Sequence, residues 1–154
     1  MDLRERLAEA TKEAMRARDT QRLSTLRLVT AAIRDREIAL RSEVGSDAVL
    51  GESELYALLG KMLRQRQDSA RAFEEAGRLE LAERELAEMG YIQEFMPRQL
   101  GEAEVEAAID SAIAATGATG LRDMGAVMAA LRARHAGEID FAAAGPRVKA
   151  RLMG

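Results

Sequence analysis

The chain has 154 residues, of which 47% are apolar and 32% charged, a composition that predicts a globular fold and excludes a disordered chain. The formal net charge is −3, and the absence of cysteine excludes disulfides and thiolate chemistry. No apolar run approaches the roughly 18 residues of a membrane span, and the first residues lack a signal-peptide core, so we expect a cytoplasmic protein with no membrane partner.

Two helices are predicted at the start of the chain. Asp2 with Glu5 three residues later is typical of a helix N-terminus, and apolar residues follow at helical spacing. A second helix is predicted from Asp19 to about Arg41, and its inward residues are expected to be Leu23, Leu26, Val29, Ile33 and Ile38. Residues 42–52 are rich in glycine, serine and acidic residues, which predicts a connecting loop.

A helical hairpin is predicted next, and it ends before the first proline. The third helix should end at Gly77, because glycine favours the left-handed conformation that closes a helix. The fourth helix should begin at Arg78, and its inward residues are expected to be Leu79, Ala82, Leu86 and Met89. It should stop near Phe95, because the residue before Pro97 is disfavoured in helical angles.

The third predicted helix carries two polar residues on its apolar face. Spacings of 4, 3, 4, 3 and 4 place on one face Leu55, Leu59, Met62, Arg66, Ser69 and Phe73. Burying a guanidinium without a partner is costly, so Arg66 is predicted to pair with an acidic residue of the next helix. The candidates are Glu83, Glu85 and Glu88, and Ser69 is expected to allow close helix approach.

Three shorter helices are predicted after Pro97, where the sequence becomes rich in alanine. The first contains Val105 to Ile113, the second contains Met124 to Leu131, and the third contains Phe141 to Leu152. The dipeptide Gly145-Pro146 should shorten or distort the last one. No hairpin turn or strand pattern is present, so we predict an all-α fold: an N-terminal helical bundle or hairpin domain over 1–96 and a small three-helix domain over 97–154.

Residue types that usually carry catalysis are scarce. The single histidine, His135, has no cysteine or second histidine nearby with which to build a zinc site. The segment Gly117-Ala118-Thr119-Gly120 lacks the Gly-Lys-Ser/Thr ending of a phosphate-binding loop. We therefore predict no catalytic, cofactor or metal residues, and expect the chain to catalyse nothing by itself.

The charges are distributed in blocks. Residues 16–41 hold seven arginines and three acids, a local charge of +4, and residues 61–71 hold four cations and one acid, a local charge of +3. Residues 74–94 hold seven glutamates and two arginines, a local charge of −5. The basic helices can form a phosphate-binding surface, or they can pair with the acidic helix inside the fold.

Several segments resemble the GatB/YqeY family over nearly the whole chain: Arg22–Arg27, Gln65–Ser69, Glu85–Glu88, Phe95–Leu100 and Asp123–Met128. Within them, the structural motif residues are Arg66, Ser69, Pro97, Asp123 and Gly125. The resemblance implies an N-terminal helical bundle and a small helical domain. It also implies kinship with the tail of the GatB protein of the tRNA-dependent amidotransferase, which contacts tRNA while transamidation and ATP use lie elsewhere.

The resemblance and the basic blocks together predict a non-catalytic, tRNA-associated accessory module. The candidate phosphate-binding residues are Arg27, Arg34, Arg41, Arg64, Arg71, Arg122, Arg132, Lys149 and Arg151. Ala126 and Glu138 stand where relatives tend to carry cations, which implies a modest affinity. The alternative is a protein-interaction module that docks to an amidotransferase or another translation protein. A stand-alone carbon–nitrogen ligase or amidase that uses glutamine is the third and least supported hypothesis.

Overall fold

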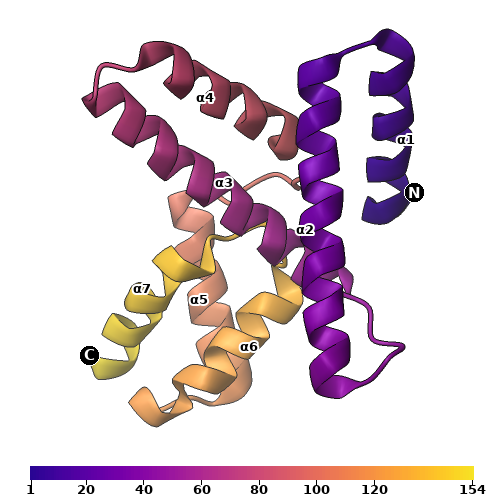
Figure 1. Ribbon diagram of the computed structural model, residues 1–154. Coiled ribbons are helices and arrows are strands. Elements are labelled where there is room, and N and C mark those ends of the chain that lie inside the picture. The colour runs from indigo at the N-terminus through magenta and orange to yellow at the C-terminus, as the bar shows by residue number, and fades with distance from the viewer. The chain divides into compact units, whose positions relative to one another are not determined.

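The computed structural model describes residues 1–154 and consists of helices and loops without a strand, which confirms the all-α fold class (Figure 1). The chain forms two compact units, Met1–Met96 and Pro97–Gly154. We call them the N-terminal unit and the C-terminal unit. The division falls at Pro97, where the composition of the sequence changes.

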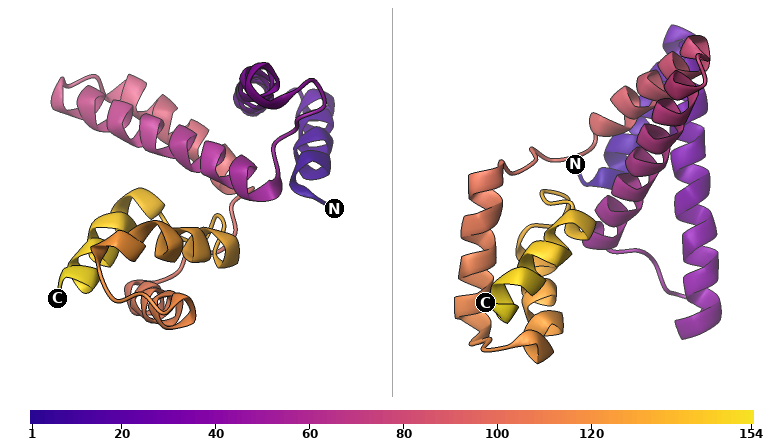
Figure 2. Two further views of the ribbon diagram at one scale, coloured as in Figure 1. Left: turned by 90° about the horizontal axis from the view of Figure 1, so that it is seen from below. Right: turned by 90° about the vertical axis from the view of Figure 1, so that its left-hand side faces the viewer.

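The N-terminal unit contains two helical hairpins. Its helices are α1 (Leu3–Ala17), α2 (Thr20–Val44), α3 (Glu52–Glu75) and α4 (Leu79–Gln93). Figures 1 and 2 show α1 antiparallel to α2, and α3 antiparallel to α4. The first two helices begin where capping predicts, because Asp2 accepts a hydrogen bond from the Glu5 N–H at 2.8 Å and Asp19 accepts one from Arg22 at 3.2 Å.

The core of this unit is built from one stripe of each helix. Leu26, Val29, Leu59 and Ile92 are fully buried, and Leu3, Leu7, Ala10 and Ala14 form the buried stripe of α1. Each buried leucine, isoleucine or valine contributes about 1.5–3 kcal/mol relative to an exposed one, so these residues dominate the stability of the unit.

The end of α2 was predicted three residues too early. The helix passes Arg41 and ends at Val44, and Gly45 closes it with φ of +130°. Residues 42–44 continue the helical hydrogen bonding, and the Gly45 N–H still donates to the Arg41 carbonyl at 3.0 Å. A glycine, rather than the polar residues before it, therefore stops this helix.

The C-terminal unit contains three helices and one short 3-10 turn. They are α5 (Glu102–Thr116), η1 (Leu121–Asp123), α6 (Met124–Arg134) and α7 (Phe141–Met153), and their core is centred on Ile109, Val127, Leu131 and Val148. The predicted shortening at Pro146 does not occur, because α7 continues through it. Pro146 and Ala142, whose carbonyl loses its helical donor, both lie on the exposed side of α7.

Candidate nucleic-acid interface

Arginines line the outward face of α2. Leu26, Val29 and Ile33 occupy the buried face of this helix, and Arg27 and Arg34 lie beside it on an exposed face. Arg41 follows another seven residues later and is exposed as well. Seven residues correspond to about 10.5 Å along a helix, so the three cations form a line that we call the α2 arginine face.

The three arginines of this face differ in what they contact. Arg41 Nε donates to the Ala48 carbonyl at 3.0 Å and so helps to hold the loop after α2. Arg27 and Arg34 have no ion-pair partner in the structure. Their guanidinium groups can therefore meet an anion without first breaking an ion pair in the fold.

Other arginines of the N-terminal unit are held by carboxylates. Arg4 pairs with Glu37 at 2.5 Å, and Arg22 pairs with Glu94 at 2.9 Å. The Arg6 guanidinium lies 5.5 Å from the centre of the Phe95 ring and donates to the Glu94 carbonyl at 3.0 Å. The Arg4–Glu37 pair joins α1 to α2, and the contacts of Arg22 and Arg6 join these two helices to the residues that follow α4. Arg22 of the basic block is therefore structural.

Arg66 has the acidic partner that the sequence predicts. Its Nε lies 3.0 Å from an oxygen of Glu88, and its Nη1 donates to the Met62 carbonyl at 3.2 Å. The side chains of Arg66 and Glu88 are 13% and 21% exposed, so the pair is largely shielded from water. Burial, and then the neighbouring charge of Glu88, raise the pKa of Glu85. Ser69 lies half-buried on the same face of α3.

The predicted inward face of α4 is right in part. Ala82 is buried and Met89 is half-buried, whereas Leu79 and Leu86 are 62% and 48% exposed. Ile92 is buried as well, and the side of α4 that faces α3 holds Glu88, the partner of Arg66. An analogous error occurs on α2, where Ile38 is 54% exposed and Glu37 is buried in its place. Ile38 follows Ile33 by five residues, which breaks the spacing of three or four that keeps residues on one face.

Glu37 is a buried charged residue of the N-terminal unit that was not predicted from the sequence. Its carboxylate is 8% exposed and accepts hydrogen bonds from the Leu50 N–H at 2.8 Å and from Arg4. The Leu50 N–H, followed by Arg4, lowers the pKa of Glu37 despite its burial. The signal was available, because Glu37 continues the stripe Leu26, Val29, Ile33 in the way that Arg66 continues the stripe of α3.

The α3 candidates form a weaker basic face. Arg64 and Arg71 are exposed and lie seven residues apart on α3. Asp68, which is also exposed, lies between them on the same face and reduces the local charge. On the α2 arginine face the intervening positions are Ala31 and Ile38, so no acid interrupts the line of cations there.

The candidates of the C-terminal unit do not form a continuous surface. Arg151 is engaged by Glu106 at 2.7 Å and by Asp110, and Arg132 lies 5.7 Å from the centre of the Phe141 ring. Arg122 and Lys149 are exposed, on η1 and α7 respectively. The carboxylates of α5 thus neutralise part of the positive charge that the sequence places here.

The remaining motif residues have structural contacts. Asp123 accepts hydrogen bonds from the N–H groups of Thr119 at 2.9 Å and Gly120 at 3.3 Å, and these lower its pKa. Its carboxylate therefore fixes the turn that precedes α6. Two residues after Pro97, the side-chain amide of Gln99 donates to the Pro97 and Gly137 carbonyls. Gly125 is exposed in α6, and no atom lies within 4 Å of where its Cβ would be.

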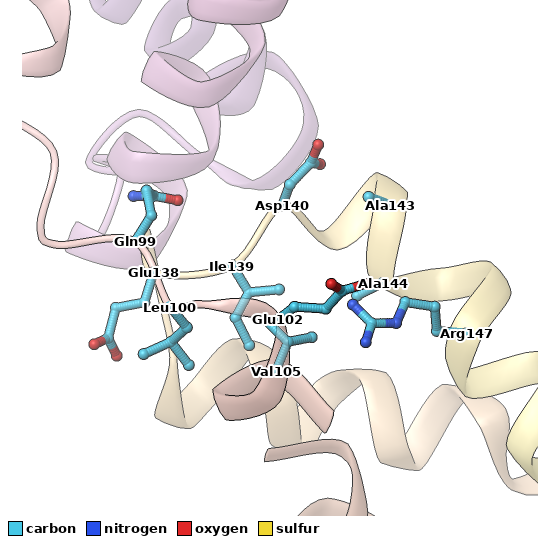
Figure 3. A pocket seen from close by; sticks show the side chains of 10 residues that line it. All are labelled: Gln99, Leu100, Glu102, Val105, Glu138, Ile139, Asp140, Ala143, Ala144 and Arg147. Atoms are coloured by element: carbon cyan, nitrogen blue, oxygen red, sulfur yellow. The ribbon is translucent and has the colours of Figure 1, made fainter. Parts of the chain in front are cut away.

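A cavity of about 390 Å³ opens where the segment after Pro97 meets the segment before α7 (Figure 3). The two segments are joined by the Leu100 N–H, which donates to the Glu138 carbonyl at 2.9 Å. The floor is apolar and the rim carries carboxylates, with lining residues Gln99, Leu100, Glu102, Val105, Glu138, Ile139, Asp140, Ala143, Ala144 and Arg147. Arg147 is engaged by Glu106, so the rim has no cation available for a phosphate.

No group of three or more histidine, cysteine, aspartate or glutamate side chains is placed to hold a metal ion. None of the helices combines the length and apolar character that a membrane span requires.

Residues 4–152 match the family model described as Yqey-like protein. The chain belongs to this family. The match covers residues of both units.

Curated relatives of this YqeY-like chain are fungal proteins named "Altered inheritance of mitochondria protein 41, mitochondrial". The protein from Lachancea thermotolerans is 33% identical over 107 residues, 68% of this chain and 54% of the relative. Those from Clavispora lusitaniae and Saccharomyces cerevisiae strain YJM789 are 36% and 33% identical over 85 residues, 55% of this chain and 46% and 43% of the relatives. The chain spans about half the length of these relatives.

The expected cytoplasmic location is overturned by these matches, because the relatives are named as mitochondrial proteins. The error has a physical reason. The absence of cysteine argues against an oxidising compartment, but it does not distinguish one reducing compartment from another.

Proposed function

We propose that this YqeY-like protein is a non-catalytic accessory module that binds tRNA through its phosphates, with the α2 arginine face as the contact surface. The observation that carries the proposal is a contrast between arginines of one unit. Arg4, Arg22 and Arg66 are paired with carboxylates, whereas Arg27 and Arg34 are exposed without an ion pair. Exposed cations in a line are the usual electrostatic footprint of phosphate binding.

The choice of tRNA rests on the family resemblance. The segments Gln65–Ser69 and Phe95–Leu100 resemble the tail of the GatB protein of the tRNA-dependent amidotransferase, and that tail contacts tRNA. The parts of the amidotransferase that perform transamidation and use ATP have no counterpart in this chain. An accessory role in RNA binding is therefore a better proposal than independent amidase or ligase activity.

The composition favours phosphate contacts over base recognition. The chain has two tyrosines and three phenylalanines, and Phe95 is buried, so few aromatic side chains are available to stack on bases. Contacts of arginine with phosphate position an RNA but carry no sequence information. We expect nonspecific binding with a Kd of about 1 μM or weaker near physiological salt.

The test is tRNA binding in a salt series. Arg27→Glu with Arg34→Glu should abolish binding and leave the helical circular-dichroism spectrum unchanged. The matched control reverses two exposed cations of the acidic helix region, Arg78→Glu with Arg84→Glu, and should retain most of the affinity. The wild-type logarithmic affinity should fall linearly with the logarithm of salt concentration. Equal losses in both double variants, or no tRNA binding at low salt, would refute the proposal.

A protein-interaction role is the second candidate. The observation that favours it is the exposure of two aliphatic residues on the outward side of α2, Leu28 at 49% and Ile38 at 54%. An amidotransferase or another translation protein is the proposed partner. Docking through apolar groups depends less on salt than phosphate binding does, so the same salt series separates the two candidates.

A further inference from the structure

The outward face of α4 carries leucines that the core of the N-terminal unit does not use. Leu79, Glu83, Leu86 and Gly90 follow one another at spacings of 4, 3 and 4, so they lie on one face, which we call the α4 leucine stripe. Leu79 is 62% exposed and Leu86 is 48% exposed. Ile92 is buried on the far side of the helix, and Ala82, which borders the stripe beside Leu79 and Leu86, is buried as well.

Gly90 gives a second, independent observation on this stripe. A glycine inside a helix is about 1 kcal/mol less favourable than alanine. Apart from its chain neighbours and the backbone of its own helix, no atom lies within 4 Å of where a Cβ on Gly90 would be, and the residue has no positive φ. Neither packing nor backbone geometry within the unit requires glycine there. An exposed helical glycine next to Leu86 provides room for another backbone to approach closely.

A surface of complementary charge and matching spacing exists on α2. Arg27, Ala31, Arg34 and Ile38 also follow at spacings of 4, 3 and 4 and lie on the exposed face. Their charged positions are basic, whereas the charged position of the α4 leucine stripe is Glu83. Both surfaces alternate charged and apolar or small residues, and both keep more than half of one large aliphatic side chain exposed, Ile38 on α2 and Leu79 on α4.

We infer that the α4 leucine stripe binds the α2 arginine face of a second copy of this chain. With the two helices parallel, Glu83 lies opposite Ala31, between Arg27 and Arg34, each about 5 Å away along the axis. The same register brings Leu79 and Leu86 against the aliphatic stems of the two arginines. It also places Gly90 opposite Ile38, so the position that lacks a side chain receives the largest apolar residue of the other face.

The test is the molar mass in solution without RNA, measured by sedimentation equilibrium across the micromolar range. Glu83→Arg should weaken self-association about tenfold or more, and so should Arg27→Glu with Arg34→Glu. A chain carrying all three reversals should associate again, because the charges are exchanged between the two surfaces. Glu13→Arg, an exposed reversal on α1, is the matched control and should associate like the wild type.

Gly90→Gln separates association from folding. Glutamine is a better helix former than glycine, so the variant should melt at a higher temperature while it associates more weakly. A wild-type chain that is monomeric throughout, a Gly90→Gln variant that associates like the wild type, or a triple reversal that fails to recover would each overturn the inference. Glu83→Arg removes no cation from α2 and frees the α2 arginine face from the second copy, so it should not lower tRNA affinity. Self-association and tRNA binding can therefore fail independently.

Discussion

At the scale of single residues, the Arg66–Glu88 pair makes the first prediction. Both side chains are largely shielded from water, so removing one leaves the other charge desolvated without a partner. Arg66→Ala should therefore lower the free energy of unfolding by about 2–3 kcal/mol, measured by urea denaturation. A loss below about 0.5 kcal/mol, which is usual for surface positions, would mean that the pair contributes little to stability.

The control for Arg66 is a double substitution. Arg66→Ala with Glu88→Ala removes both charges, so no carboxylate is left without its guanidinium. The double variant should be less destabilised than the sum of the two single variants, with a coupling above about 0.5 kcal/mol. Additive single effects would contradict a direct interaction.

Glu37 predicts a pH dependence of stability. The Leu50 N–H and Arg4 stabilise its ionised form, so its pKa in the folded protein lies below the ordinary value of 4.5. A group with a depressed folded pKa contributes stability above its unfolded pKa, and that contribution is lost as the pH falls through the folded pKa. Wild-type stability should therefore fall on acidification below about pH 4.5, and Glu37→Gln should lose less over the same interval.

Thermal melts of the wild type, Glu37→Gln and Glu43→Gln check this expectation. Glu43 is exposed on the same helix and serves as the matched control. At neutral pH, Glu37→Gln should be destabilised by about 1–3 kcal/mol, because a charge-assisted hydrogen bond to the Leu50 N–H is weakened. Parallel pH profiles for the wild type and Glu37→Gln would show that another carboxylate causes the acid sensitivity.

The two buried charges also show how far a residue pattern predicts contacts. A polar residue in an apolar stripe identifies Arg66 from the sequence, and the same pattern applies to Glu37. The choice of Glu88 among three neighbouring glutamates depends on the rotation of α4 against α3, which no local pattern contains. A local pattern also cannot show which candidate cations are paired in the fold, because the ion pair between Arg151 and Glu106 is a tertiary contact.

At the scale of elements, helix starts were predictable because capping is local. Asp2 and Asp19 each accept a hydrogen bond from the backbone three residues ahead, as their sequence positions indicate. The face of a helix that packs into the core is harder to predict when apolar residues occur on more than one side of that helix. On α4, Leu79 and Leu86 are exposed although their spacing with Ala82 predicts burial, and the side of the helix that faces α3 holds Glu88, the partner of Arg66.

Gly60 provides a prediction about an element. It lies inside α3, and no atom lies within 4 Å of where its Cβ would be. Gly60→Ala should stabilise the protein by up to about 1 kcal/mol, through helix propensity and a less flexible unfolded chain, and should raise the Tm. Gly77→Ala is the contrasting variant, because Gly77 has φ of +73° after α3 and alanine is strained there. A lower Tm for Gly60→Ala would contradict the open space around it.

At the scale of the whole molecule, the candidate cations are divided between two units. Five of them lie on α2 and α3 of the N-terminal unit, namely Arg27, Arg34, Arg41, Arg64 and Arg71, and the other four lie in the C-terminal unit. The charge pattern along the chain predicts basic helices, but it does not reveal which cations the fold pairs internally. The proposed tRNA contact therefore uses fewer cations than the nine candidates predicted from the sequence.

The separate cores predict separate stabilities. Ile109 is fully buried among residues of the C-terminal unit, and Ile92 is fully buried among residues of the N-terminal unit. Truncation of either to alanine should cost its own unit about 2–5 kcal/mol. Hydrogen exchange measured by NMR should then show that Ile109→Ala lowers amide protection in α5, α6 and α7, while protection in α2 and α3 is retained.

Ile92→Ala is the reciprocal variant and should lower protection in α2, α3 and α4 while α5 and α6 keep theirs. The physical reason is that each cluster of buried residues is drawn from one unit, so a cavity in one removes no contact from the other. A single cooperative loss of protection in both units after either substitution would contradict this reasoning. It would mean that the two units unfold together, with a coupling between them that exceeds the cost of the cavity.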